Sequence, residues 1–109
     1  MDLANKKCVP CEGGTPPLTS SETTEYKKMI DSFWEVIEDG KKIKRKFKFK
    51  DFGQAMVFVN KVADVAEQEQ HHPDIKIHYN LVEITLWTHA VMGLSENDFI
   101  LAAKIDKAT

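Results

Sequence analysis

The chain has few of the features that mark metal-clustered or membrane-bound proteins. It has only two cysteines, Cys8 and Cys11, which is half of a zinc site, and no second CxxC follows. No apolar run approaches the roughly 20 residues that cross a bilayer, and the start, MDLANKKCVP, lacks the apolar segment of a secretory signal. We therefore expect a cytoplasmic protein without a membrane anchor.

A strong charge of one sign is also missing. Fifteen basic and seventeen acidic side chains give a formal charge of −2, so no global field attracts nucleic acid or anionic lipid. The 109 residues are 42% hydrophobic and 29% charged, which is the composition of one small globular domain with a modest core.

The two cysteines lie in CVPCEGGTPP, a stretch rich in glycine and proline that has no hydrophobic periodicity. A redox CxxC would be expected in a βαβ context, which the neighbouring sequence lacks. This composition favours a flexible N-terminal arm over residues 1–17, followed by a single domain over residues 18–109.

Three helices are predicted from capping signals. Thr19 and Glu22 form a capping box for the first helix, and Asp51 with Gln54 caps a longer second one. The expected apolar positions of the first helix are Tyr26, Met29, Ile30 and Phe33, and those of the second are Phe52, Met56, Val59, Val62, Ala63 and Ala66.

The second helix should end near His71 or His72, because Pro73 disfavours helical geometry in the residue before it. Ser95 starts the last helix, with Asp98 at its third position and Leu94 and Phe99 as a hydrophobic staple.

Two pairs of strands are predicted between these helices. Asp39-Gly40 is a hairpin dipeptide, and Asn80 is a turn position between the alternating runs IKIHY and LVEITLW. After the first turn, apolar residues alternate with four lysines, which we interpret as the solvated face of a strand rather than an anion-binding strip: Lys42, Lys44, Lys46 and Lys48. The order helix-strand-strand-helix-strand-strand-helix predicts a two-layer α+β domain, with a four-stranded antiparallel sheet and three helices on one face.

The stretch EQEQHHPDIKIHY holds the candidate functional residues, because two adjacent histidines stand where the long helix stops. A metal site is disfavoured, since stiff sites take ligands at i and i+4 of a helix or i and i+2 of a strand, and HHP supplies neither. Imidazole titrates near pH 6.5 and can both donate and accept protons, which suits acid–base catalysis. A purely structural role in capping the helix end remains an equal alternative on spacing alone.

Seven residues stand at the spacing of a known signature. The chain reads E-xxx-HHP-DIKIH-Y-NLVEITLWT-H-AVMGLSEN-D from Glu67 to Asp98. This pattern resembles that of the pterin-4a-carbinolamine dehydratases, and the similarity extends over roughly residues 18–107, including FKFKDFGQAMVFVNKVADVAEQ and GLSENDFILAAKI. Even the arm CVPCEGGTPPL looks like the start of some members of this family.

The resemblance implies a specific activity. Such enzymes dehydrate 4a-hydroxytetrahydrobiopterin, released by aromatic amino acid hydroxylases, to quinonoid dihydrobiopterin, and they use no metal or organic cofactor. It implies that His71, His72 and His89 form the catalytic cluster, whose acid and base are not distinguished by the sequence. We expect supporting or substrate-binding roles for Glu67, Pro73, Trp87 and Asp98, with Glu67 paired to His71 one helical turn away.

Partners follow from the same resemblance. It implies a homodimer or homotetramer, a pterin substrate and functional coupling to an aromatic amino acid hydroxylase, while charge and hydropathy predict no direct nucleic-acid or membrane partner. Some members of the family also act as dimerisation cofactors of a transcription factor, and that role would add a nuclear presence. A degenerate relative serving as an assembly chaperone is disfavoured, because all three histidines are present.

Overall fold

The computed structural model describes residues 3–9 and 15–109. Its elements are a 3₁₀ helix η1 (Leu3–Asn5), α1 (Ser20–Lys27), β1 (Glu35–Ile37), β2 (Lys42–Lys48), α2 (Phe52–Glu69), β3 (Asp74–His78), β4 (Leu81–Leu86), a 3₁₀ helix η2 (His89–Val91) and α3 (Glu96–Ala108). The order of helices and strands is the predicted one. The fold is α+β, with three α-helices and a four-stranded antiparallel sheet.

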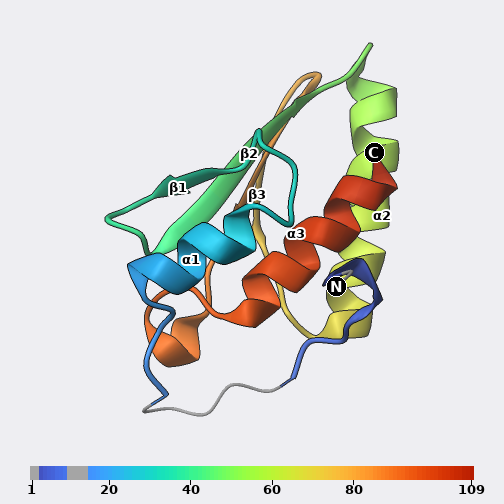
Figure 1. Cartoon of the computed structure of the whole chain (residues 1–109). Helices are drawn as coiled ribbons and strands as arrows, with labels where there is room; N and C mark the ends of the chain where they lie inside the picture. The colour runs from blue at the N-terminus through green and yellow to red at the C-terminus, as the bar shows by residue number, and fades with distance from the viewer. Residues whose placement is uncertain (1–2, 10–14) are drawn as a thin grey trace.

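The sheet has the strand order β1-β2-β4-β3, and every neighbouring pair is antiparallel. Figure 1 shows the three helices packed on one side of this sheet, with α2 along one edge of the molecule and α3 crossing in front of it. In β2, Ile43 and Phe47 face the helices and are buried, as predicted from the alternation with lysines. The opposite face carries those lysines, one of which, Lys44, pairs with Glu83 at 3.4 Å.

Local signals correctly predicted where the helices begin. The Thr19 hydroxyl accepts the Glu22 N–H at 3.2 Å, and the Asp51 carboxylate accepts the Gln54 N–H at 2.8 Å. The turn between β1 and β2 is also as expected, since Gly40 and its neighbour Asp39 both have positive φ angles.

The predicted apolar faces of two helices are wrong in part. The first helix ends at Lys27, so Phe33 lies beyond it and is 71% exposed, while Trp34 takes the buried position. The cause is Asp106 of α3, whose carboxylate accepts the indole N–H of Trp34 at 2.8 Å and the backbone N–H of Asp31 at 3.0 Å. These contacts hold the chain in a loop after Lys27.

In α2 the buried stripe is rotated from the expected one and consists of Ala55, Phe58, Val62 and Ala66. Phe52, predicted to be buried, is 50% exposed. The reason is the ring of Phe58, which packs against Phe47 at 4.6 Å and Phe49 at 5.0 Å between centroids. Burying such side chains stabilises the fold by roughly 1.5–3 kcal/mol each.

Part of the N-terminal arm has a defined position in the structure. Leu3 in η1 is 2% exposed and belongs to the core, where η1 packs on α3. Figure 1 shows this segment lying across the carboxyl end of α2, beside α3. The N-terminal arm predicted over residues 1–17 thus contains a segment, residues 3–9, that is docked on the domain.

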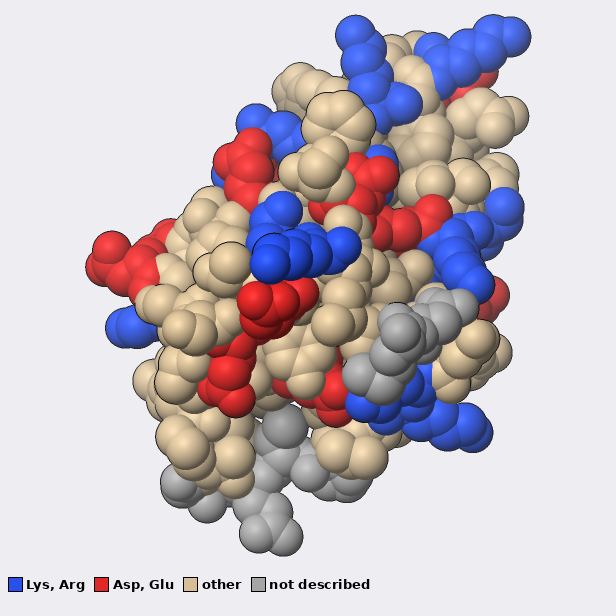
Figure 2. All heavy atoms as spheres, in the orientation of Figure 1, with Lys and Arg blue, Asp and Glu red and all other residues tan. Residues whose placement is uncertain are grey.

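The surface bears charges of both signs. Lysine, arginine, aspartate and glutamate side chains are interspersed over the face in Figure 2, in line with the small net charge. Within the described part of the chain, no helix is both long and apolar enough to cross a membrane.

Candidate active site

His71 is placed by the way α2 ends. The helix stops at Glu69, two to three residues before the predicted end near His71 or His72, and Gln70 adopts a left-handed conformation with φ 52°. The His71 N–H then bonds back to the carbonyl of Ala66 at 3.2 Å, which closes the helix end. A non-glycine residue in this conformation costs roughly 1–2 kcal/mol, and here it turns the His71 side chain toward α3.

The partner of His71 is Asp98, in the first turn of α3. The distance from His71 Nε2 to Asp98 Oδ1 is 2.6 Å, and the side chains are 13% and 0% exposed. The other oxygen, Asp98 Oδ2, accepts the Thr88 hydroxyl at 2.8 Å and the Ser95 N–H at 2.9 Å. Asp98 therefore caps α3 and contacts a histidine at the same time.

These contacts define which nitrogen of His71 is available for chemistry. The buried carboxylate of Asp98 accepts all three hydrogen bonds around it, so Nε2 of His71 is the donor nitrogen. Among residues 3–9 and 15–109, no hydrogen bond engages the other ring nitrogen, Nδ1. A carboxylate that fixes the orientation and tautomer of an imidazole in this way is a recurring feature of acid–base sites.

The partner of His72 is Glu67, which was expected to pair with His71. Glu67 was predicted to pair with His71, but its Oε2 lies 2.8 Å from Nε2 of His72 instead. The left-handed residue Gln70 breaks the helical spacing, so the i, i+4 geometry between Glu67 and His71 is lost. Both side chains of the pair are exposed, at 58% for His72 and 71% for Glu67.

His89 lies just after β4, at the start of η2. Its ring packs against Trp87 in a tilted arrangement, with centroids 3.8 Å apart and planes at 40°. The ammonium group of Lys42 lies over the Trp87 ring, 4.7 Å from its centroid. Trp87 therefore contacts a histidine of the predicted cluster and packs on the open face of the sheet.

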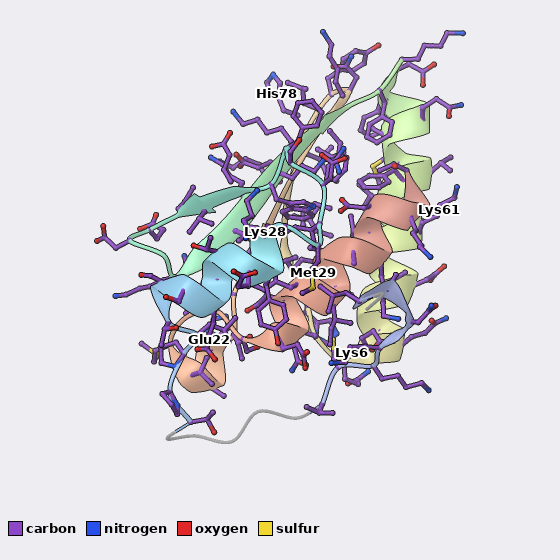
Figure 3. The ribbon with its side chains drawn as sticks, viewed as in Figure 1. Lys6, Glu22, Lys28, Met29, Lys61 and His78 are labelled. Carbon is purple, nitrogen blue, oxygen red and sulfur yellow. The ribbon has the colours of Figure 1, made fainter. Side chains whose placement is uncertain are left out.

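Two further residues of the motif stretch lie outside these contacts. Pro73 directly precedes β3 and is half-buried, so it sets the connection between α2 and the sheet. His78 ends β3 and is exposed. Figure 3 shows His78 at the opposite end of the molecule from Lys6 and the carboxyl end of α2, so it is not part of the candidate site.

A cavity of about 550 Å³ adjoins the His71–Asp98 pair. Its lining comes from the N-terminal segment, the end of α2, the turn after β4 and the start of α3: Cys8, Val9, Gln68, Glu69, Gln70, His71, Thr88, Ala90 and Asn97. His71 is the predicted site residue that lines it. Thr88 and Ala90, on either side of His89, bring the turn with the third histidine to the cavity's edge.

Thr88 is a functional candidate that the sequence reasoning missed. It is 5% exposed, and its hydroxyl donates to Asp98. The signal was present in the alternation of β4, because Val82, Ile84 and Leu86 all face the core, which places residue 88 on the same side.

Cysteine chemistry is disfavoured at Cys8, and Cys11 lies outside the described residues. Burial, together with the nearby Glu69 carboxylate, raises the pKa of the Cys8 thiol to about 12, so the thiolate that binds metals is suppressed. In residues 3–9 and 15–109, no three side chains of His, Cys, Asp or Glu converge in a way that could hold a metal ion.

Comparison with known proteins identifies the family. The model of the pterin 4 alpha carbinolamine dehydratase family matches residues 16–108. A protein of Alkaliphilus metalliredigens, named "Putative pterin-4-alpha-carbinolamine dehydratase", is 48% identical over 97% of this chain and 95% of its own length. A protein of the same name from Nitrosomonas eutropha is 50% identical over 96% of this chain and 91% of its own.

Solved structures agree with this result. A transcriptional coactivator/pterin dehydratase from Brucella melitensis superposes with a TM-score of 0.79 and 38% identity, covering 84% of this chain and 97% of that one. A pterin dehydratase-like protein identified as a RuBisCO assembly factor in the alpha-carboxysome shares the fold, with a TM-score of 0.61 and 24% identity over 69% of this chain and 87% of its own.

The fold and these relatives define a small α+β enzyme of the hydro-lyase class. The chain belongs to the pterin 4 alpha carbinolamine dehydratase family.

Proposed function

We propose that the protein dehydrates 4a-hydroxytetrahydrobiopterin to quinonoid dihydrobiopterin by histidine acid–base catalysis. The observation that carries the proposal is the buried Asp98–His71 pair at the wall of a cavity of about 550 Å³. Family membership supplies the substrate class, and the pair supplies a group able to transfer a proton.

The reaction needs two proton transfers. The substrate carries a hydroxyl and a ring N–H on neighbouring atoms, and loss of water breaks the C–O bond while a C=N bond forms. The leaving hydroxyl takes one proton and departs as water, and the ring nitrogen gives up its proton to a base. One imidazole acting as acid and another acting as base meet both demands, each contributing typically ~10²–10⁴-fold.

The contacts of the histidines suggest how these roles are divided. His71, held through Nε2, presents Nδ1 as the base that takes the ring N–H proton. His72 or His89 then protonates the leaving hydroxyl, with Glu67 orienting His72 and Trp87 orienting His89. Pro73 limits the freedom of the chain between the two adjacent histidines and β3.

We place this reaction in the recycling of the pterin cofactor of aromatic amino acid hydroxylases, in the cytoplasm. Functional coupling to such a hydroxylase and a homodimeric or homotetrameric assembly complete the proposal. A sheet with β1 and β3 at its edges offers strand edges to a second copy.

The test follows quinonoid dihydropterin formation from a 4a-hydroxytetrahydropterin, with EDTA present. We expect the wild type to exceed the buffer rate and His71→Ala to lose at least ~10²-fold in kcat/KM. His78→Ala is the matched control, because it removes an exposed histidine away from the site and should keep full activity. A wild type no faster than buffer refutes the dehydratase proposal, and loss of activity in EDTA refutes its metal-free form.

A second candidate function rests on the Brucella melitensis relative, whose name includes a transcriptional coactivator. In that role the chain would be a dimerisation cofactor that binds another protein through a helical surface. Co-purification of a transcription factor with both wild type and His71→Ala would support it, since binding would not need the catalytic histidine.

A further inference from the structure

The N-terminal segment is attached to the domain along its whole described length. Leu3 is buried in the core, and the Lys104 ammonium donates to the carbonyl of Ala4 at 2.8 Å. Further along, Lys6 pairs with Glu96 at 2.6 Å. Residues 3–9 are therefore a fixed part of the folded surface around α3.

The attachment is closest at the end of the segment that reaches the cavity. The side-chain amide of Asn97 accepts the Val9 N–H at 3.0 Å and donates to the Val9 carbonyl at 2.6 Å. The carboxylate of Glu69 accepts the Cys8 N–H at 2.8 Å. One amide side chain thus satisfies both backbone groups of Val9, much as a neighbouring strand would.

These residues and the candidate catalytic group border the same space. Cys8 and Val9 line the cavity of about 550 Å³ together with His71 and Thr88. Val9 is 63% exposed, so an apolar side chain stands uncovered beside the histidine. The thiol of Cys8 is neutral at physiological pH, because burial raises its pKa to about 12. The side chains of Cys8 and Val9 thus form an uncharged and partly apolar wall of the cavity, which suits contact with a neutral pterin ring, while the Glu69 carboxylate lies beside them.

From this arrangement we infer that Cys8 and Val9 are substrate contacts, which cover one side of the bound pterin, and that Asn97 is the residue that positions them. The inference rests on the proposed dehydratase function, since it assigns the pterin to this cavity. The arm then sets substrate affinity, while the histidines that follow α2 and β4 carry the chemistry.

The first test shortens the side chain of Val9. In Val9→Ala we expect KM for the pterin to rise by about three- to tenfold with kcat unchanged, because two methyl groups that the ligand would cover are lost. Lys7→Ala is the matched control, since Lys7 is an exposed residue of the same segment that does not line the cavity. A KM for Val9→Ala equal to that of wild type and Lys7→Ala overturns the inference.

The second test removes the side chain that holds Val9 in place. Asn97→Ala should raise KM by more than Val9→Ala does, because both backbone bonds of Val9 are lost, and kcat should change less than KM. Tyr26→Phe is the control for stability, since it removes another side-chain hydrogen bond to the first turn of α3, from Tyr26 Oη to Glu96 at 3.0 Å. Equal effects of the two variants on KM would make Asn97 merely structural and would overturn its positioning role.

A third readout is independent of catalysis. In a Cys11→Ser background, the rate of alkylation of Cys8 reports whether Cys8 and Val9 are docked on the domain and whether a ligand covers them. We expect Asn97→Ala to speed labelling at least ~10-fold, because a released thiol regains its ordinary reactivity, and 7,8-dihydrobiopterin to slow labelling of the wild-type arm.

The outcomes separate the two proposals. Protection of Cys8 by the pterin, without any turnover, refutes the dehydratase function and keeps the arm as a pterin contact. Turnover without protection of Cys8 and without a KM change in Val9→Ala refutes the role of Cys8 and Val9 as substrate contacts and leaves the dehydratase function intact. Absence of both turnover and protection refutes both.

Discussion

His71 and His72 are neighbours in the chain, yet their surroundings are opposite. The His71–Asp98 and His72–Glu67 distances are similar, at 2.6 and 2.8 Å. Asp98 is fully buried and accepts two further hydrogen bonds, whereas Glu67 is 71% exposed. An exposed ion pair contributes about 0–1 kcal/mol, while leaving a buried polar group without its hydrogen-bond partner costs about 1–3 kcal/mol. Burial, more than distance, determines what each carboxylate does for its imidazole.

The largest effect should come from Asp98→Asn. An amide has one acceptor, and if it serves Thr88 and Ser95, its NH₂ faces His71 and forces the imidazole into the other tautomer. Nδ1 then carries the proton and cannot act as the base, so we expect kcat to fall by ~10²–10⁴-fold. The free energy of unfolding should fall by about 1–3 kcal/mol. Steady-state kinetics and urea unfolding measure the two losses, and a variant with wild-type kcat would show that Asp98 only caps α3.

Thr88→Val should give the next largest effect. The substitution keeps the shape of the buried side chain and removes the hydroxyl that donates to Asp98 Oδ2. We expect unfolding to become easier by about 1–3 kcal/mol, because a charged acceptor loses one of its donors in the core. The control is Thr85→Val, on the outer face of β4 shortly before Thr88 and half-buried. Equal stability of the two variants would contradict the importance of burial.

Lys6→Met tests a pair of intermediate exposure. Lys6 and Glu96 are 35% and 34% exposed, and the hydrogen bond from Lys6 lowers the pKa of Glu96 below its ordinary value of 4.5. The stabilisation is therefore present above pH 4.5 and is lost as the pH falls through the folded-state pKa. We expect a difference from wild type of less than about 1 kcal/mol, since solvent screens the pair. Unfolding at pH 7 and at pH 3 checks this, and a difference that grew toward low pH would contradict it.

Glu67→Gln should have the smallest effect on stability, within about 0.5 kcal/mol, because the His72 pair is exposed to solvent. Its effect on kcat should also remain below about tenfold, since Gln can still hydrogen-bond the imidazole. Chemical denaturation and the dehydratase assay measure both quantities. A kcat loss as large as that of Asp98→Asn would show that exposure does not weaken this carboxylate.

The sequence predicted the features that depend on neighbouring residues. The caps at Thr19, Asp51 and Ser95, the Asp39-Gly40 turn and the strand alternation each need only a few adjacent side chains. The order of elements and the two-layer architecture followed from them.

Features set by distant contacts were predicted less well. The face of α2 depends on Phe58 meeting rings from β2 and its following residue, and the early end of α1 depends on Asp106. In the site, the pairing of the two histidines depends on one left-handed residue, Gln70, which no spacing rule anticipates. The motif identified the residues, and the tertiary structure decided which of them meet.

The β3–β4 hairpin separates the two members of the buried pair, and its length has a consequence for how this chain can change. Adding one residue within β4 would turn Thr88 to the opposite face of the sheet and remove its hydroxyl from Asp98. Adding two would restore the face but shift Thr88 by roughly 7 Å along the strand. Insertions should therefore survive in the exposed turn at Glu38–Gly40 and be eliminated between residues 81 and 88, even though both segments belong to hairpins of the same sheet.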